Sequence, residues 1–268
     1  MVELYSLLWV LASKAPRNRR ISIMREIARA DGPVNPVGDC NAKTALPSTY
    51  RPVGKTCPQD CRFLQPPPFN PKHPRRKGSP MCLALFGKTG RHQAKASPDA
   101  GPSLRAAAIA MISAAQEGNP ARLHVGGDLG RTWAEASVYV DGLREMSRFI
   151  RDRAGDPARV TAFGYTHLPM NSALYGLWSD GLMFRRSDYG GYMGAMTGAH
   201  SKRPSGAFKC LEQVSPWGPE NPNGYTCSTC RMCWTHPHNP VLFKPARGSF
   251  ADELETPVSI EPSRSDLG

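Results

Sequence analysis

The sequence carries three cysteines in one tight run near its C-terminal end. Cys227, Cys230 and Cys233 are each separated by two residues, and Cys210, after an apparent short strand at 206–209, can supply a fourth thiolate. Thiols at this spacing converge within the reach of a metal ion or a metal cluster. The run therefore predicts a metal centre, and buried cysteines that serve only in packing are the alternative.

The spacing of these thiols also bears on the identity of the metal. A structural zinc site usually pairs two separated CxxC knuckles, whereas one CxxCxxC run with a remote cysteine is typical of iron–sulfur ligation in ferredoxins. The pattern favours a [4Fe–4S] cluster. Zinc bound by three of the cysteines together with His236 or His238 is the alternative.

A second set of cysteines lies in the N-terminal part of the chain. Cys57 and Cys61 form a CxxxC pair, and Cys82 follows after a basic, proline-rich stretch at 62–81. Three thiolates leave one iron of a cubane open, which is the condition for binding S-adenosylmethionine. We treat this set as a candidate second metal site, although the radical-SAM signature CxxxCxxC places its third cysteine much closer. Cys40 has no close cysteine partner and is predicted to be a spectator.

Helices and strands are predicted to alternate between the two cysteine sets. The expected order is helix, strand, helix, strand, helix and strand, over residues 103–117, 122–125, 132–154, 159–164, 171–178 and 182–185. This alternation is typical of parallel βα units. The units are too few for a complete eight-fold barrel, so we predict an α/β fold of the partial or irregular TIM-like (β/α) barrel type. An open doubly wound sheet is the alternative.

The distribution of proline, glycine and charge divides the chain into three segments. Residues 1–102 are expected to form an N-terminal helix, over about residues 5–30, and a loop-rich cysteine segment packed on the barrel. Residues 103–250 should hold the barrel core and the C-terminal cysteine motif. Residues 251–268 are acidic and are expected to form a flexible tail.

The predicted strands end in polar residues, where parallel βα folds gather their functional groups. We expect a pocket there, lined by His124, Gly126, Gly127, Tyr165 and Arg185. Asp128 and His167 are the candidate catalytic residues. The alternatives are a turn or helix-capping role for Asp128 and an ordinary loop position for His167. His124 could equally be a core histidine, and Arg185 could hold a phosphate or carboxylate or form a salt bridge.

The charge of the chain bears on its partners and its location. A net charge of +12 suits a nucleic acid or nucleotide partner, and a basic but inert surface is the alternative. The apolar run at residues 5–12 is too short to cross a bilayer, and the basic residues follow it, opposite to a secretory signal. We therefore expect a cytoplasmic protein without membrane attachment. In that reducing compartment the eight cysteines favour metal binding over disulfides.

Several short motifs together resemble a family of uncharacterised, cysteine-rich bacteriophage and prophage proteins. The motifs are TCPxxC with a further cysteine, HxxGD, a YT pair, CxxCxxCW and VxF, found here at 56–61 with Cys82, 124–128, 165–166, 227–234 and 241–243. The resemblance covers about residues 40–245. It implies a TIM-like scaffold, bound iron–sulfur and a role in phage biology within the host cytoplasm, and it implies no particular reaction. Family members carry the third N-terminal cysteine close to the second, unlike this chain.

Four functions remain open at this point. The first is a phage-type iron–sulfur protein with a pocket at the strand ends, its reaction unspecified. The second is a radical-SAM-like enzyme that uses Cys57, Cys61 and Cys82. The third is a zinc-containing, DNA-modifying enzyme similar to the transglycosylases that exchange guanine for a deazaguanine, with Asp128 as the nucleophile. The fourth is a nucleic-acid-binding protein whose cluster is only structural.

Overall fold

The computed structural model describes residues 2–38, 45–59, 61, 82, 87–169, 171–187, 194–197, 207–209, 226–236 and 239–243. Its helices are α1 Val2–Lys14, α2 Arg17–Ala30, α3 Gly87–Gln93, α4 Ala100–Ala115, α5 Trp133–Ala154, α6 Ser172–Ser179, α7 Cys227–Cys230 and α8 Met232–Thr235. Its strands are β1 Val37–Gly38, β2 Ser48–Thr49, β3 Ala121–Arg122, β4 Ala162–Thr166, β5 Leu182–Ser187, β6 Gly194–Thr197, β7 Phe208–Lys209 and β8 Val241–Phe243. The predictions for Cys40, Cys210, His238 and the acidic tail fall outside the described residues.

The described strands form one sheet in the order β1-β2-β3-β4-β5-β6-β8-β7. Only the β1–β2 pair is antiparallel, and every other neighbouring pair is parallel. The longest pairing joins β4 to β5, from the 162–182 pair to the 166–186 pair. This arrangement confirms the expected α/β class with a mostly parallel sheet.

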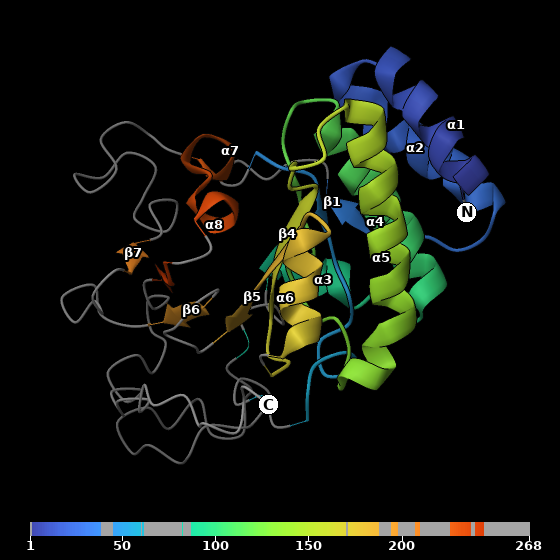
Figure 1. Cartoon of the computed structure of the whole chain (residues 1–268). Coiled ribbons are helices and arrows are strands. Elements are labelled where there is room, and N and C mark those ends of the chain that lie inside the picture. The colour runs from blue at the N-terminus through green and yellow to red at the C-terminus, as the bar shows by residue number, and fades with distance from the viewer. Residues whose placement is uncertain are drawn as a thin grey trace.

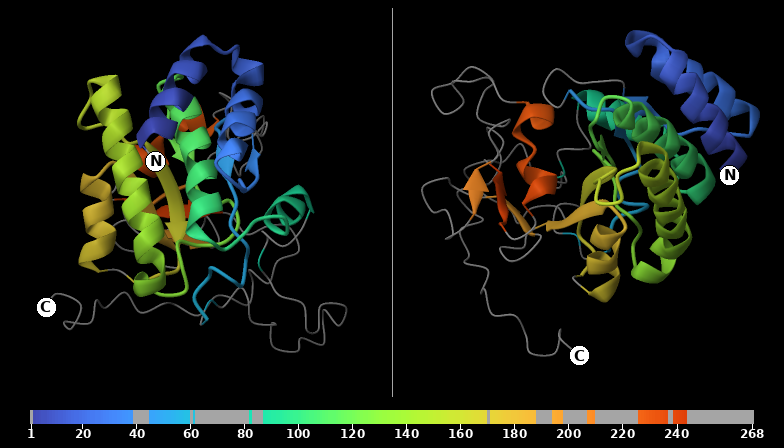
Figure 2. Two further views of the ribbon diagram at one scale, coloured as in Figure 1. Left: turned by 90° about the vertical axis from the view of Figure 1, so that its right-hand side faces the viewer. Right: turned by 45° about the horizontal axis from the view of Figure 1, so that its top comes forward.

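The long helices cover one face of the sheet. Helices α4, α5 and α6 connect successive parallel strands from β2 to β5 and lie together on one side of them (Figure 1). Connections of one hand that advance along the sheet in one direction place their helices on the same face. The short helices α7 and α8 lie on the other side of β4 and β5 (Figure 2).

Helix α4 forms the centre of the core. It is buried around nearly its whole circumference, because α1 and α2 pack on one side of it, and β3 and α5 lie on other sides. Its small alanines allow these neighbours to approach closely. The contact with α5 is close at Gly142, where a Cβ atom would lie 2.6 Å from the Leu104 side chain. A larger residue at position 142 would therefore push α5 away from α4.

Two of the expected elements differ in the structure. The predicted N-terminal helix over residues 5–30 is wrong as a single element: α1 ends at Lys14, and α2 starts after Pro16. Proline lacks the N–H needed inside a helix but fits at its start. The strand expected at 122–125 stops at Arg122, because His124 adopts a left-handed conformation with φ of 55°. The backbone of Val125 still donates to the Thr49 carbonyl at 2.9 Å.

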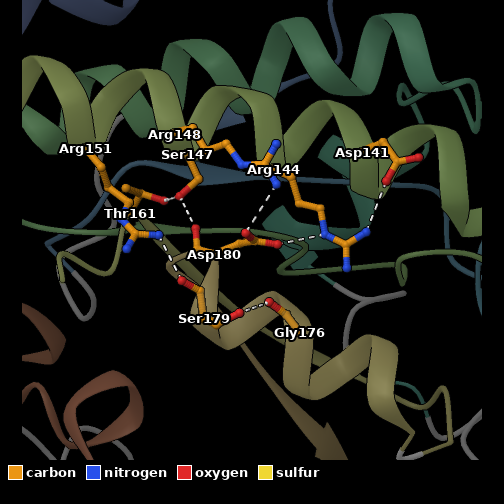
Figure 3. A network of polar contacts seen from close by, with 9 residues as sticks. All are labelled: Asp141, Arg144, Ser147, Arg148, Arg151, Thr161, Gly176, Ser179 and Asp180. Carbon is orange, nitrogen blue, oxygen red and sulfur yellow. Dashed lines mark hydrogen bonds and ion pairs between the residues drawn. The ribbon is translucent and has the colours of Figure 1, made fainter. Parts of the chain in front are cut away.

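A polar network fastens α5 to the turn before β5 (Figure 3). The Asp180 carboxylate accepts a hydrogen bond from Arg144 Nε at 2.9 Å, and Arg151 donates to a carbonyl at the end of α6. Ser147, fully buried on α5, donates to the Asp180 carbonyl at 2.5 Å and lies 2.7 Å from Thr161 Oγ1. These contacts attach the end of α6 and the start of β5 to the part of α5 that carries Arg144, Ser147 and Arg151.

Ser147→Ala should destabilise the fold by about 1–3 kcal/mol, because it leaves a buried carbonyl without its hydroxyl donor. Urea unfolding followed by circular dichroism measures this change. Ser137→Ala is the matched control on the same helix, since the Ser137 hydroxyl bonds only to the Ala134 carbonyl at an exposed position. An equal effect of the two substitutions would show that the network does not stabilise the fold.

Candidate metal centre

The carboxyl ends of β3 and β4 meet at Asp128. The Asp128 side chain is fully buried, and each of its two carboxylate oxygens accepts two hydrogen bonds. Oδ1 accepts from Thr166 Oγ1 at 2.5 Å and from the Leu129 N–H at 2.7 Å. Oδ2 accepts from the His167 N–H at 2.7 Å and lies 3.2 Å from His167 Nδ1. The structure thus brings together both candidate catalytic residues, Asp128 and His167.

The pairing of Asp128 with His167 fixes the charge of the imidazole. Burial acts to lower the pKa of His167, but hydrogen bonds with Asp128 and with Cys61 outweigh it and raise the pKa to about 10. The raised pKa favours the protonated form of the His167 imidazole at neutral pH. A carboxylate held by this many donors is a poor nucleophile, because attack would require these hydrogen bonds to break. The geometry favours a positioning role for Asp128.

The capping alternative for Asp128 does not describe its position. Helix α5 is capped by Thr132, whose side chain accepts a hydrogen bond from the Glu135 N–H at 3.2 Å. The backbone N–H of Asp128 instead donates to Thr56 Oγ1 at 3.0 Å. Asp128 therefore connects β3 to the segment after β2.

Gly126 and Gly127 allow the backbone after β3 to lie close to the backbone of Arg51. Gly127 has a φ of +80°, and a Cβ atom there would lie 2.4 Å from the Arg51 carbonyl oxygen. The Gly126 carbonyl accepts a hydrogen bond from the Arg51 N–H at 2.9 Å. Only glycine fits this crossing of two chain segments. The space expected for a ligand beside Gly127 is thus occupied by the backbone of residue 51.

Arg51 is a structural residue of the site that the sequence reasoning missed. Its guanidinium is buried, donates to the carbonyls of Asp128 and Leu129, and donates to the Pro98 carbonyl at 2.7 Å. It also lies 4.3 Å from the centre of the Tyr139 ring. Its position in an irregular segment between Tyr50 and Pro52 gave no periodic pattern that would have indicated burial.

His124 lies in the core between β3 and α5. Its Nε2 is 2.8 Å from the Tyr139 hydroxyl, and its ring stacks on Phe184 with the centroids 5.7 Å apart. Burial, and then the charge of Arg51, hold the pKa of His124 well below its ordinary value. A neutral ring with a hydroxyl partner and an aromatic neighbour matches the core-histidine interpretation.

The N-terminal cysteines lie next to the Asp128–His167 pair. Cys57 and Cys61 are buried and Cys82 is partly buried, all three as free thiols. Burial raises the pKa of Cys57 to about 12. The nearby side chains of Asp128, Cys61 and Cys82 act in the same direction. Cys61 is also a hydrogen-bond partner of His167. The structure therefore gathers these thiols at the ends of β2, β3 and β4.

The C-terminal cysteines lie on two short helices against the opposite face of the sheet. Cys227 and Cys230 belong to α7 and Cys233 to α8, and all three are partly buried free thiols. Trp234 is buried and packs on Phe163 of β4 with the ring centroids 4.7 Å apart. This contact attaches the cysteine run to the sheet.

Arg185 anchors the same run from β5. Its side chain is only 1% exposed, and its guanidinium donates to a set of backbone carbonyls. The acceptors are Cys233 at 2.8 Å, His236 at 2.8 Å, Asn239 at 3.0 Å and Met232 at 3.4 Å. The sequence reasoning expected a phosphate, a carboxylate or a salt bridge as its partner. The structure shows carbonyls of the cysteine run in that place.

Tyr165 contacts the C-terminal cysteines directly. Its hydroxyl donates to Cys233 Sγ at 3.2 Å, and Arg122 lies 6.0 Å from the centre of its ring. Burial raises the pKa of the Cys233 thiol, while the Tyr165 hydroxyl and the charges of Arg185 and Arg122 act to lower it. The hydroxyl donor and the two cations thus oppose the effect of burial, which is the larger one. Among the described residues, however, no three His, Cys, Asp or Glu side chains form a group that could hold a single metal ion.

Asp128→Asn should destabilise the protein by about 3–5 kcal/mol, because it removes one charge of a buried pair and places an amide N–H₂ against hydrogen-bond donors. Asp141→Asn is the control: Asp141 pairs with Arg144 at the surface, and we expect a change of less than about 1 kcal/mol. Urea unfolding at neutral pH measures both changes. A neutral Asp128→Asn substitution would contradict the role given to this carboxylate.

Comparisons with known proteins give no match. No protein-family model, no curated protein and no solved structure is matched by this chain. In the described part of the chain, no helix is both long enough and apolar enough to span a membrane. The assignment of function therefore depends on the residues at the ends of the strands.

Proposed function

We propose that this chain is an iron–sulfur protein of the phage type that the sequence motifs resemble. Cys210, Cys227, Cys230 and Cys233 would bind one [4Fe–4S] cluster against the face of the sheet opposite α4, α5 and α6. The observation that carries the proposal is the environment of Cys233, whose sulfur accepts the Tyr165 hydroxyl hydrogen bond with two arginines nearby. Hydrogen bonds to ligand sulfurs and neighbouring charges are the means by which proteins tune such clusters.

The local architecture of the cysteine run supports a bound cofactor. Helices α7 and α8 have four residues each, too few to be stable on their own. They are held by Trp234 on β4 and by the carbonyl contacts of Arg185 on β5. A cofactor that links several cysteines would supply the remaining cohesion of this segment, as metals do in other small cysteine-rich units.

We also propose that the scaffold is a partial TIM-like barrel. Two features support this: the parallel strands from β2 to β6 follow one another in chain order, and the helices that connect β2 to β5 lie on one face (Figure 2). A doubly wound sheet reverses its strand order at a switch point and carries helices on both faces. The β6-β8-β7 end of the sheet, with α7 and α8 on the other face, is the feature that favours this alternative.

Anaerobically purified Cys230→Ala protein should lose about four irons and four sulfides per chain relative to the parent, with a weaker visible absorption band. Counts of iron, acid-labile sulfide and zinc measure this, and Cys40→Ala is the control that removes a thiol predicted to be a spectator. Loss of zinc in place of iron would replace the cluster with a zinc site. Unchanged metal content would refute the proposal.

Tyr165→Phe should keep the cluster but lower its reduction potential, because a hydrogen bond to a ligand sulfur stabilises the more negative, reduced state. Iron counts and an anaerobic redox titration followed by electron paramagnetic resonance separate these two effects. Tyr175→Phe serves as the matched control, since Tyr175 lies partly exposed on α6. An unchanged potential in the Tyr165 variant would show that the hydroxyl does not interact with a cluster ligand.

A further inference from the structure

We infer that Cys57, Cys61 and Cys82 bind a second iron–sulfur cluster, at the ends of β2, β3 and β4 beside Asp128 and His167. This site is separate from the one proposed for the C-terminal cysteines. It would account for the buried thiols that the proposed function leaves unused. The cofactor class is a cubane held by three thiolates.

The first support is the rigid placement of an irregular segment. The backbone after β2 has no strand partner beyond Thr49, yet Cys57 and Cys61 are each only 5% exposed. The Thr56 hydroxyl donates to the Pro52 carbonyl at 3.0 Å, and the Cys61 N–H donates to the Pro58 carbonyl at 3.1 Å. These local bonds present both thiols from a fixed turn. Two cysteines held in one turn are placed as they would be for shared ligation.

The second support is the convergence of a cysteine that is remote in sequence. Residues 62–81 separate Cys82 from Cys61, yet Cys82 is among the groups whose charge acts on Cys57. The sequence alone left the third ligand of this set undefined. Its nearness to Cys57 makes Cys82 the candidate third ligand, and none of the three thiols is in a disulfide.

The third support is the set of polar groups around the thiols. Arg51 is a buried cation, and Cys57 is among the groups near enough to act on its pKa. His167 is a hydrogen-bond partner of Cys61 and is itself oriented by Asp128. Three thiolates leave one iron of a cubane for a ligand other than cysteine.

A cluster and a single metal ion require different spacings of their ligands. The described side chains do not form a compact group for a single ion. A cubane presents one coordination position on each of four irons, so it holds its thiolates farther apart than one tetrahedral ion does. Cysteines that are neighbours without being in direct contact can therefore still share a cluster.

Iron and sulfide counts on full-length, anaerobically reconstituted protein test this inference separately from the proposed function. The parent should hold about eight irons per chain, and Cys57→Ala/Cys61→Ala and Cys227→Ala/Cys230→Ala should each hold about four. Electron paramagnetic resonance of the two variants should show two different reduced signals. Cys40→Ala should keep all eight irons.

Each result points one way. If the parent holds about four irons and loses them only in the Cys227→Ala/Cys230→Ala variant, the second cluster is overturned and the proposed function stands. If the iron is lost only in the Cys57→Ala/Cys61→Ala variant, the proposed function is overturned and the cluster at Cys57, Cys61 and Cys82 stands. Should that variant fail to fold by circular dichroism, Cys82→Ser, at a partly buried position, must lose about four irons; full iron content in it would overturn the inference.

Discussion

The buried carboxylate of Asp128 is the interaction on which the ends of the strands depend. Irregular segments that leave a sheet lose their ladder partners, so side chains must satisfy the backbone there. Asp128 does this for β4 by accepting from Thr166 and His167, while its own N–H is held by Thr56 after β2. One residue thereby fixes three chain segments relative to one another. The N-terminal thiols are carried by one of these segments.

Two buried arginines make a second constraint of the same kind. Arg51 and Arg185 each donate hydrogen bonds to backbone carbonyls. The planar guanidinium has five N–H donors, so one side chain can bind several carbonyls at once. Burying a cation is costly unless negative charge or good acceptors are close. Arg51 acts on Cys57, and Arg185 acts on Cys233. Each cysteine set therefore has a buried arginine beside it.

The sequence predicted what local signals determine and missed what tertiary contacts determine. Helix α5 begins within one residue of its predicted start, because Thr132 caps it, and it ends at a left-handed Gly155. The VxF motif at 241–243 lies on strand β8. The partners of Asp128 and the carbonyl contacts of Arg185 could not be predicted, since they join residues far apart in sequence. The convergence of Cys82 on Cys57 is of the same kind.

The carboxyl end of β4 contacts both cysteine sets. Successive residues of a strand point to opposite faces. Tyr165 points to the face that carries α8 and donates to Cys233, whereas Thr166 points to Asp128. His167 follows directly and contacts Cys61. Tyr165 and His167, two residues apart at the end of β4, thus reach the two cysteine sets, and a change in the position of β4 would alter the surroundings of both.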